Sequence, residues 1–319
     1  MLRYVIKRLL LMIPVVLGVS FFIFVAVNAA NGDYVDSLNT DDMTKEEVAN
    51  LRAKYDLDKP LLVRYGKYMW NLLHGDLGTS YATGLPVFEM FMSKIGNTLY
   101  LAIGASLVCW ILAIPLGVFA AKHRGSILDN LSSVLGILGL SIPNFWLGLV
   151  LIIVFALYLR LLPSGGADSA VSVILPAITV GTGQMATLMR TTRSTMVDCL
   201  GQDYLRTARA KGVSEKKVIN FHALRNALIP IINIALTQFA SSLAGAALTE
   251  SVFSWPGVGK MIIDGINSRD TPIVCGCMIL KCIIISLTTL LIDLLFVAVD
   301  PRVKTNFVTA KKGGKKKNA

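Results

Sequence analysis

Charged residues are scarce in this sequence. Asp, Glu, Lys and Arg together make up 16% of its 319 residues, whereas they make up about 25% of a typical soluble domain. Hydrophobic residues make up 54%, and several runs extend for 20 or more residues without a charge. A run of that length crosses the roughly 30 Å hydrocarbon core of a bilayer as one helix. The scarcity of charge therefore excludes a soluble protein and predicts an integral membrane protein.

Cysteine and histidine are few and scattered, which argues against a disulfide framework or a metal site. Four of the five cysteines lie in or beside apolar runs, where a free thiol packs as a small hydrophobe, and no Cys-x-x-Cys spacing occurs. The three histidines have no zinc-ligand spacing. We therefore expect no disulfide, metal or cofactor in this chain. The residues concerned are Cys109, Cys199, Cys275, Cys277, Cys282, His74, His123 and His222.

The first apolar run resembles a signal peptide, because Arg3, Lys7 and Arg8 precede it. The run from Leu9 to Ala30 has 22 residues, however, and the apolar part of a signal peptide has only about 7–15. Its end also lacks the usual cleavage pattern. Residues 1–30 are therefore interpreted as a short cytoplasmic segment followed by a retained membrane helix.

Six apolar runs predict six membrane-spanning helices, with both termini on the same side. Twenty of the 31 Lys and Arg residues fall in segments that such a chain places on one side. Because cytoplasmic loops are enriched in Lys and Arg, both termini are expected in the cytoplasm of a cell with a bacterial-type inner membrane. The basic balance then needs no nucleic-acid partner. The runs are 9–30, 99–121, 131–159, 170–189, 226–249 and 272–299.

The predicted organisation has an extracytoplasmic helical segment at 31–98, a membrane core at 99–299 and a basic cytoplasmic tail at 300–319. In the extracytoplasmic segment, Thr44 and Glu47 form a capping-box pattern for a helix that ends near Tyr55. Pro60 suits the first turn of a second helix, and Gly75 suits the left-handed position after it. This all-α segment is expected to be folded.

The loop at 198–225, between the fourth and fifth runs, has the pattern of two short helices. Residues 203–211 predict a helix that Gly212 ends, and Ser214 can cap the next one. Asp203, Thr207 and Lys211 share a face at i, i+4 and i+8. Such a helix could fit a groove of a partner protein, or it could lie as a basic amphipathic loop on anionic lipid.

The segment 203–230, DYLRTARAKGVSEKKVINFHALRNALIP, resembles the EAA loop of binding-protein-dependent ABC importers, in the form of the dipeptide/oligopeptide/nickel permease family. The order of further motifs along nearly the whole chain resembles the B-type subunit of that family. These motifs are MLRYVIKRLLLMIPVVLGVSFFIFV at the N-terminus, GDLGTSY at 75–81, IPLGVFAA at 114–121, SIPNFWLGL at 141–149, ESVFSWPGVGK at 250–260 and DPRVK at 300–304.

The resemblance implies a type I ABC importer permease fold and a role in moving short peptides inward by ATP-driven alternating access. It also implies a second related permease, two cytoplasmic ATPases that bind ATP and Mg, and an extracytoplasmic binding protein. Asp203 stands where the family usually has Glu, so its side chain is one methylene shorter. The coupling residues carried over are Asp203, Tyr204, Arg206, Thr207, Ala208, Ala210, Lys211 and Gly212.

Three residues near the outer side are candidates for the substrate path. Lys281 lies inside the sixth run, where a charge is costly and marks a functional candidate. It could face the path and bind a substrate carboxylate, pair with an acid, or extend its head toward the outer surface. Glu250 and Trp255 could line the outer mouth, or they could hold a tight interfacial turn.

Other function classes fit the sequence less well. GVGK at 257–260 is not a phosphate loop, because Ser254 stands where Gly is required and Met261 where Ser or Thr is required. The chain is therefore expected to be a non-catalytic subunit. A passive channel or secondary carrier is the alternative class, and many carriers show inverted repeats, which this sequence lacks. If the protein is an importer, a nickel complex or another small solute is the alternative cargo.

Overall fold

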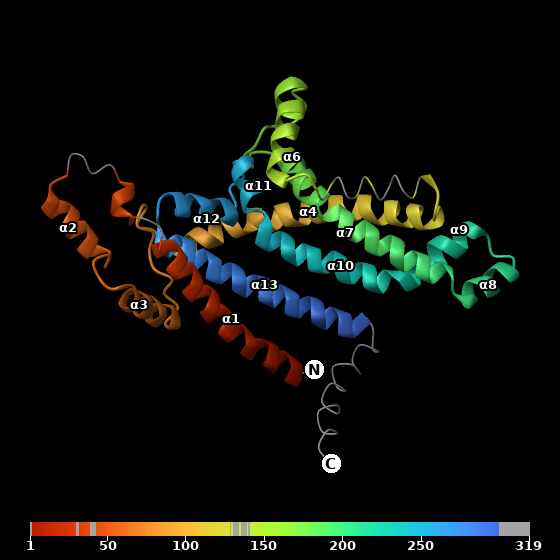
Figure 1. The fold of residues 1–319 in the computed structure, drawn as a ribbon, viewed down its shortest axis with the longest axis horizontal. Coiled ribbons are helices and arrows are strands. Elements are labelled where there is room, and N and C mark those ends of the chain that lie inside the picture. Colours follow the sequence, from red (N-terminus) through yellow and green to blue (C-terminus); the bar gives the residue numbers. More distant parts are fainter. Residues whose placement is uncertain are drawn as a thin grey trace, which may run out of the picture. The chain divides into compact units, whose positions relative to one another are not determined.

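The computed structural model describes residues 2–29, 32–38, 43–127, 129, 134, 139 and 141–299. Regular secondary structure in this part of the chain is helical throughout, apart from one isolated β-bridge between Thr79 and Pro86 (Figure 1). The all-α architecture predicted from the apolar runs is therefore confirmed.

Five helices are long and apolar enough to cross a membrane, and they confirm five of the six predicted runs. The run at 131–159 lies partly outside the described residues. Its described part holds α6 (Asn144–Leu151) and the π-helical turn η2 (Ile152–Tyr158). The long helices are α1 (Leu2–Ala29), α4 (Val87–Lys122), α7 (Ile174–Leu200), α10 (Leu224–Gly245) and α13 (Thr271–Val299).

The chain forms two compact units, each built from three separate stretches of sequence. Unit 1 comprises 1–102, 148–176 and 243–286, and unit 2 comprises 103–147, 177–242 and 287–319. Four of the long helices therefore contribute to both units: α4 and α13, and, by three residues each, α7 and α10. The boundaries predicted at residues 30, 98 and 299 stay sequence-based predictions, and the basic tail at 300–319 lies outside the described residues.

The described part of the segment at 31–98, in unit 1, folds as its local signals predict. Helix α2 (Lys45–Lys54) begins with a complete capping box, in which Thr44 and Glu47 bond each other's backbone N–H groups. Helix α3 (Leu61–Leu73) begins directly after Pro60. Gly75 has φ +82°, which is the left-handed conformation expected after a helix.

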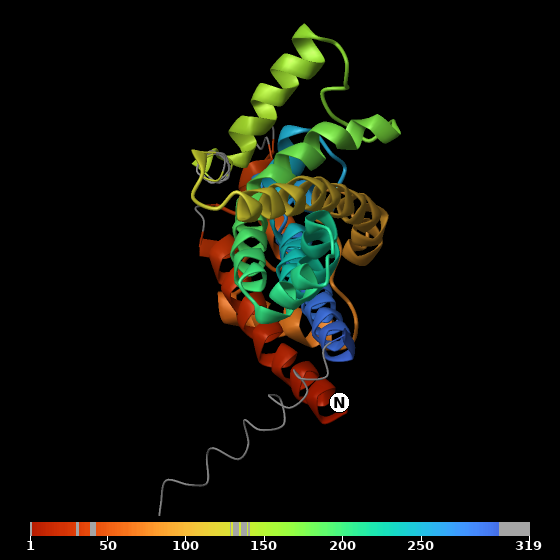
Figure 2. The same cartoon turned by 90° about the vertical axis from the view of Figure 1, so that its right-hand side faces the viewer.

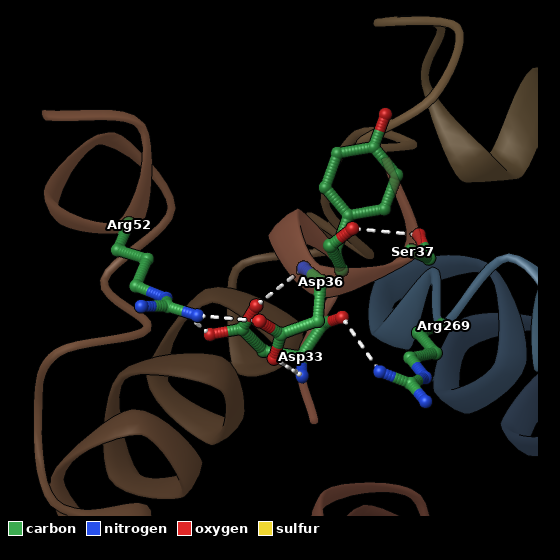
Figure 3. Close-up of polar contacts among 6 residues, drawn as sticks. Asp33, Asp36, Ser37, Arg52 and Arg269 are labelled. Atoms are coloured by element: carbon green, nitrogen blue, oxygen red, sulfur yellow. Dashed lines mark hydrogen bonds and ion pairs between the residues drawn. The ribbon is translucent and has the colours of Figure 1, made fainter. Parts of the chain in front are cut away.

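A polar cluster fixes the chain that follows α1 onto α2 (Figure 3). The carboxylates of Asp33 and Asp36 each accept the other's backbone N–H, at 3.0 and 2.7 Å. Arg52 from α2 donates to both carboxylates, at 2.8 and 2.6 Å. The backbone N–H of Asp33, and secondarily the charge of Arg52, lower the pKa of Asp36 below its usual value. Arg269 donates to the Asp33 carbonyl oxygen at 3.4 Å.

In unit 2, α7 and α10 lie side by side and share both apolar and polar contacts (Figure 2). The Gln238 side-chain amide donates to the Gln184 carbonyl at 2.9 Å, and the Gln184 amide donates to the Ser242 hydroxyl at 2.8 Å. Interhelical amide and hydroxyl bonds of this kind join helices in membranes. On α4, a Cβ at Gly117 would lie 2.6 Å from the Thr192 Cβ, so only glycine permits this approach to α7.

A buried ion pair ties the loop after α4 to α7. Arg193 donates through two nitrogens to the Asp129 carboxylate, with one bond of 2.6 Å. The Gly125 N–H donates to the same carboxylate at 2.9 Å. The Asp129 side chain is only 3% exposed. The guanidinium of Arg193, together with the Gly125 N–H, lowers the pKa of Asp129 to about 2.

We expect Asp129→Asn to lower the free energy of unfolding at pH 7 by about 2.5 kcal/mol. Because the folded-state pKa lies below the unfolded value of about 3.9, the stabilisation by Asp129 is complete above about pH 5 and is lost as the pH falls through 2. The measurement is thermal unfolding of the detergent-purified protein at decreasing pH. The control is Asp203→Asn, which changes a 94% exposed side chain and should leave the curve unchanged. Equal curves for wild type and Asp129→Asn would refute the prediction.

Candidate functional site

Helix α8 (Asp203–Ala210) ends in a complete glycine cap. Gly212 has φ +79°, a conformation that other residues adopt only with strain. Its N–H donates to the Arg209 carbonyl at 2.9 Å, and the Val213 N–H donates to the Ala208 carbonyl at 3.2 Å. This pair of bonds defines the Schellman motif. The helix at 203–211 and its end at Gly212 are therefore confirmed.

One buried residue anchors α8 to unit 2. The Leu205 side chain is fully buried, and it belongs to the same apolar cluster as Val218 and Ile219 of the π-helical segment η4 (Val218–Ala223). Beyond the turn, Arg209 donates to both carboxylate oxygens of Glu215, at 3.0 and 2.9 Å. Because Glu215 begins α9 (Glu215–Lys217), this ion pair fixes α8 to the start of the next helix (Figure 1).

The predicted coupling residues lie on the exposed surface of α8 and its turn. Seven of the eight are exposed, and Ala208 is half-buried. Asp203 and Arg206, 94% and 79% exposed, approach each other at 3.6 Å. The Thr207 hydroxyl donates to the Asp203 carbonyl of its own helix. Because the buried Leu205 anchors α8 to unit 2, the exposed side chains of α8 are available to a partner. Their role in coupling stays a prediction.

One detail of the predicted loop is wrong. Ser214 occupies the N-cap position of α9, but its side chain makes no capping hydrogen bond. The first turn of α9 is stabilised instead by the Arg209–Glu215 pair. Neither that pair nor the Leu205 anchor was predicted. The signals were a single large apolar residue in a polar helix and opposite charges on either side of a glycine turn.

A polar stripe runs along α10 and was also missed. Asn226, Pro230, Asn233, Thr237 and Ser241 are all exposed, at the i, i+4, i+7, i+11 and i+15 spacing that places them on one helix face. The stripe extends for about 22 Å. The Thr237 and Ser241 hydroxyls donate to carbonyl oxygens one turn back in α10. A polar face on a membrane helix is costly against lipid, so it faces protein or water.

Glu250 lies in α11 (Ala247–Val252) and is fully buried in unit 1. Its carboxylate accepts the Thr98 hydroxyl at 3.0 Å and the Lys260 N–H at 2.9 Å. A Cβ at Gly259 would lie 2.8 Å from the same carboxylate, and one at Gly257 would be closer still. The carboxylate therefore fixes the 250–260 turn from inside, which favours the tight-turn interpretation of this residue.

Trp255 is also enclosed by its own chain. Its side chain is buried, and the indole N–H donates to the Asn97 carbonyl at 3.0 Å. The ring stacks on Tyr100 with 6.1 Å between centroids. Through these contacts Trp255 anchors the 250–260 turn to α4. Contact with a substrate path is not required to explain it.

Lys281 of α13 is buried, with 7% of its surface exposed. This burial argues against the side chain extending to the outer surface. Within the described part of the chain its ammonium group has no ion pair within 4 Å, and Glu250 attracts it electrostatically. Two of the three path candidates, Glu250 and Lys281, are therefore both buried, and their opposite charges attract each other without a direct ion pair. Whether substrate reaches them stays a prediction.

Comparison with known proteins gives a consistent family. Residues 113–305 match the family described as "Binding-protein-dependent transport system inner membrane component", and residues 1–102 match the N-terminal region of the same membrane components. The dipeptide transport system permease protein DppB of Escherichia coli K12 is 38% identical, with 95% of this chain and 99% of that protein covered. Oligopeptide transport system permease protein AppB of Bacillus subtilis is 37% identical, covering 95% and 100%.

Glutathione transport system permease protein GsiC of Salmonella paratyphi A is 38% identical, covering 95% and 99%. Among solved structures, a chain of the MetNI methionine ABC transporter aligns with a TM-score of 0.57 at 17% identity, covering 67% of this chain and 97% of that one. This likeness confirms the type I importer permease fold. The chain belongs to the binding-protein-dependent transport system inner membrane component family, the multi-pass permeases of ABC importers.

Proposed function

We propose that this chain is the permease subunit of an importer that moves short peptides into the cytoplasm by ATP-driven alternating access. The observation that carries the proposal is α8, a short helix fixed from beneath by Leu205 and Glu215 with its predicted coupling residues exposed. An ATPase partner that grips this helix transmits rigid-body motion through the Leu205 anchor to α7 and α10.

The proposed cargo follows from the relatives, whose names specify dipeptides, oligopeptides and glutathione. The polar stripe of α10 supports it, because neutral amide and hydroxyl groups suit a path for a peptide backbone. Uncharged groups bind a passing substrate weakly enough to release it. A nickel complex or another small solute is the alternative cargo, and the uptake assay below separates the two.

The proposal assigns ATP and Mg to two partner ATPases, with a second related permease and an extracytoplasmic binding protein completing the complex. The 257–260 turn supports a non-catalytic role. Its glycines pack against the Glu250 carboxylate, and the Lys260 N–H already donates to it. Both termini and α8 are assigned to the cytoplasm.

The test is Gly212→Pro in the co-expressed complex, with ATP-dependent uptake of a labelled short-peptide set measured in vesicles. Proline cannot adopt φ +79° and removes the N–H that caps α8, so uptake should be lost while the complex still assembles. The matched control is Gly212→Ala. A Cβ there meets nothing within 4 Å, so alanine costs only about 1–2 kcal/mol of backbone strain.

Three outcomes are informative. Peptide uptake by wild type and by Gly212→Ala, but not by an assembled Gly212→Pro complex, would support both coupling and cargo. Uptake of another solute in place of peptides would retain the importer and reject the cargo. Uptake that continues without the ATPases would reject ATP-driven import.

A further inference from the structure

A groove of about 590 Å³ opens between the end of α4 and the helices that follow α8. Its volume lies in the range of about 300–1,000 Å³ that is usual for small-ligand sites. Its floor is apolar, and its rim is polar and mainly basic. The floor residues are Ile114, Pro115, Val118, Phe119, Ile219 and Leu224, and the rim residues are Lys122, Glu215, Lys216 and Asn220.

The rim carries a net positive charge. In the described residues neither Lys122 nor Lys216 has a carboxylate within 4 Å. Glu215, the acidic residue of the rim, is bound through both oxygens by Arg209, and Lys122 attracts it more weakly. Two exposed ammonium groups therefore remain at the mouth of an apolar groove.

The residues that line the groove come from the ends of two long apolar helical segments. The apolar segment that contains the α4 floor extends from Val87 to Lys122, and the segment that contains the α10 floor begins at Glu215. Both segments are long and apolar enough to cross a membrane, and the two lysines lie at their ends. A lysine at such a boundary meets the headgroup layer.

We propose that this groove binds an anionic phospholipid, with the headgroup phosphate at Lys122 and Lys216 and an acyl chain along the apolar floor. Basic pockets between membrane helices on the cytoplasmic side bind such headgroups. A helix of a second permease would match the floor but would take both ammonium groups out of water without a counter-charge, which is costly. A phospholipid satisfies the floor and the rim together.

This site is separate from the proposed transport path. A bound lipid would connect the end of α4 to the helices that follow α8. The test uses the purified complex in nanodiscs of phosphatidylcholine, with and without phosphatidylglycerol, and native mass spectrometry of retained lipid. The Lys122→Gln/Lys216→Gln variant should bind phosphatidylglycerol about 10- to 30-fold more weakly. The matched control is Arg124→Gln/Lys217→Gln, which removes the same charge from exposed neighbours that do not line the groove.

A second variant tests the floor. Val118→Phe leaves the charge unchanged and fills the groove, so it should weaken phosphatidylglycerol binding while glycerol phosphate remains a poor competitor. The proposal is overturned if the two charge pairs weaken binding equally, because the lysines then act as general surface charge. It is also overturned if glycerol phosphate competes as well as the lipid, or if the isolated chain retains lipid and the complex does not.

Discussion

Replacing Glu250 by alanine should lower the free energy of unfolding by about 2–6 kcal/mol, an effect large enough to reduce the yield of folded protein. Glu250 is fully buried and accepts hydrogen bonds from the Thr98 hydroxyl and the Lys260 N–H. Its removal leaves both donors without an acceptor in the interior and removes the carboxylate that attracts the buried Lys281. Each buried unsatisfied donor costs about 1–3 kcal/mol.

The measurement is thermal unfolding of the detergent-purified chain, by loss of monodisperse protein after heating. Glu250→Gln is the conservative control, because its amide oxygen can still accept from Thr98. A double-mutant cycle with Lys281→Met isolates the electrostatic coupling. If the Lys281→Met effect is the same with and without Glu250, the two residues are independent. Wild-type stability of Glu250→Ala would show that the 250–260 turn does not depend on its buried carboxylate.

Replacing Leu205 by alanine should reduce peptide uptake by about tenfold or more while the permease remains folded. Leu205 is the fully buried residue of α8, and buried Leu→Ala substitutions cost about 2–5 kcal/mol. Because α8 is short and polar, that loss separates it from the cluster of Val218 and Ile219. Under the proposed function, a loosened α8 would no longer transmit the motion of a bound ATPase to α7 and α10.

The assay compares ATP hydrolysis with uptake in the same vesicles. Hydrolysis should continue, because the exposed residues of α8 that are proposed to contact the ATPase are unchanged, while uptake per ATP falls. Leu205→Met is the control, since it keeps the apolar volume of the anchor and should retain uptake. Equal uptake by Leu205→Ala and wild type would mean that α8 transmits force by another route, for example through the Arg209–Glu215 pair.

Features that depend on neighbouring residues could be predicted from the sequence. The capping box of α2, the turn at Gly75 and the end of α8 at Gly212 each result from bonds within a few residues. The long apolar helices were predictable because the bilayer requires runs of fixed length. These signals do not depend on where the rest of the chain lies.

Features made by distant residues could not be predicted in the same way. Asp129 and Arg193 are separated by 64 positions, and nothing near either residue specifies the other. Hydropathy predicts that Lys281 lies inside a membrane helix but does not give the rotation of that helix, so the burial of Lys281 could not be predicted. The α10 stripe is predictable from the sequence, because its four polar residues and Pro230 follow the helical repeat within an otherwise apolar run.

The polar face of α10 also constrains how the cell makes this protein. If the proposed partner permease covers this face, a subunit synthesised in excess would expose Asn233, Thr237 and Ser241 to acyl chains, where no water satisfies their remaining lone pairs. Such a subunit would be recognisable to membrane proteases as an orphan. Balanced synthesis with its partners, as from one polycistronic message, would keep that face covered from the time of insertion.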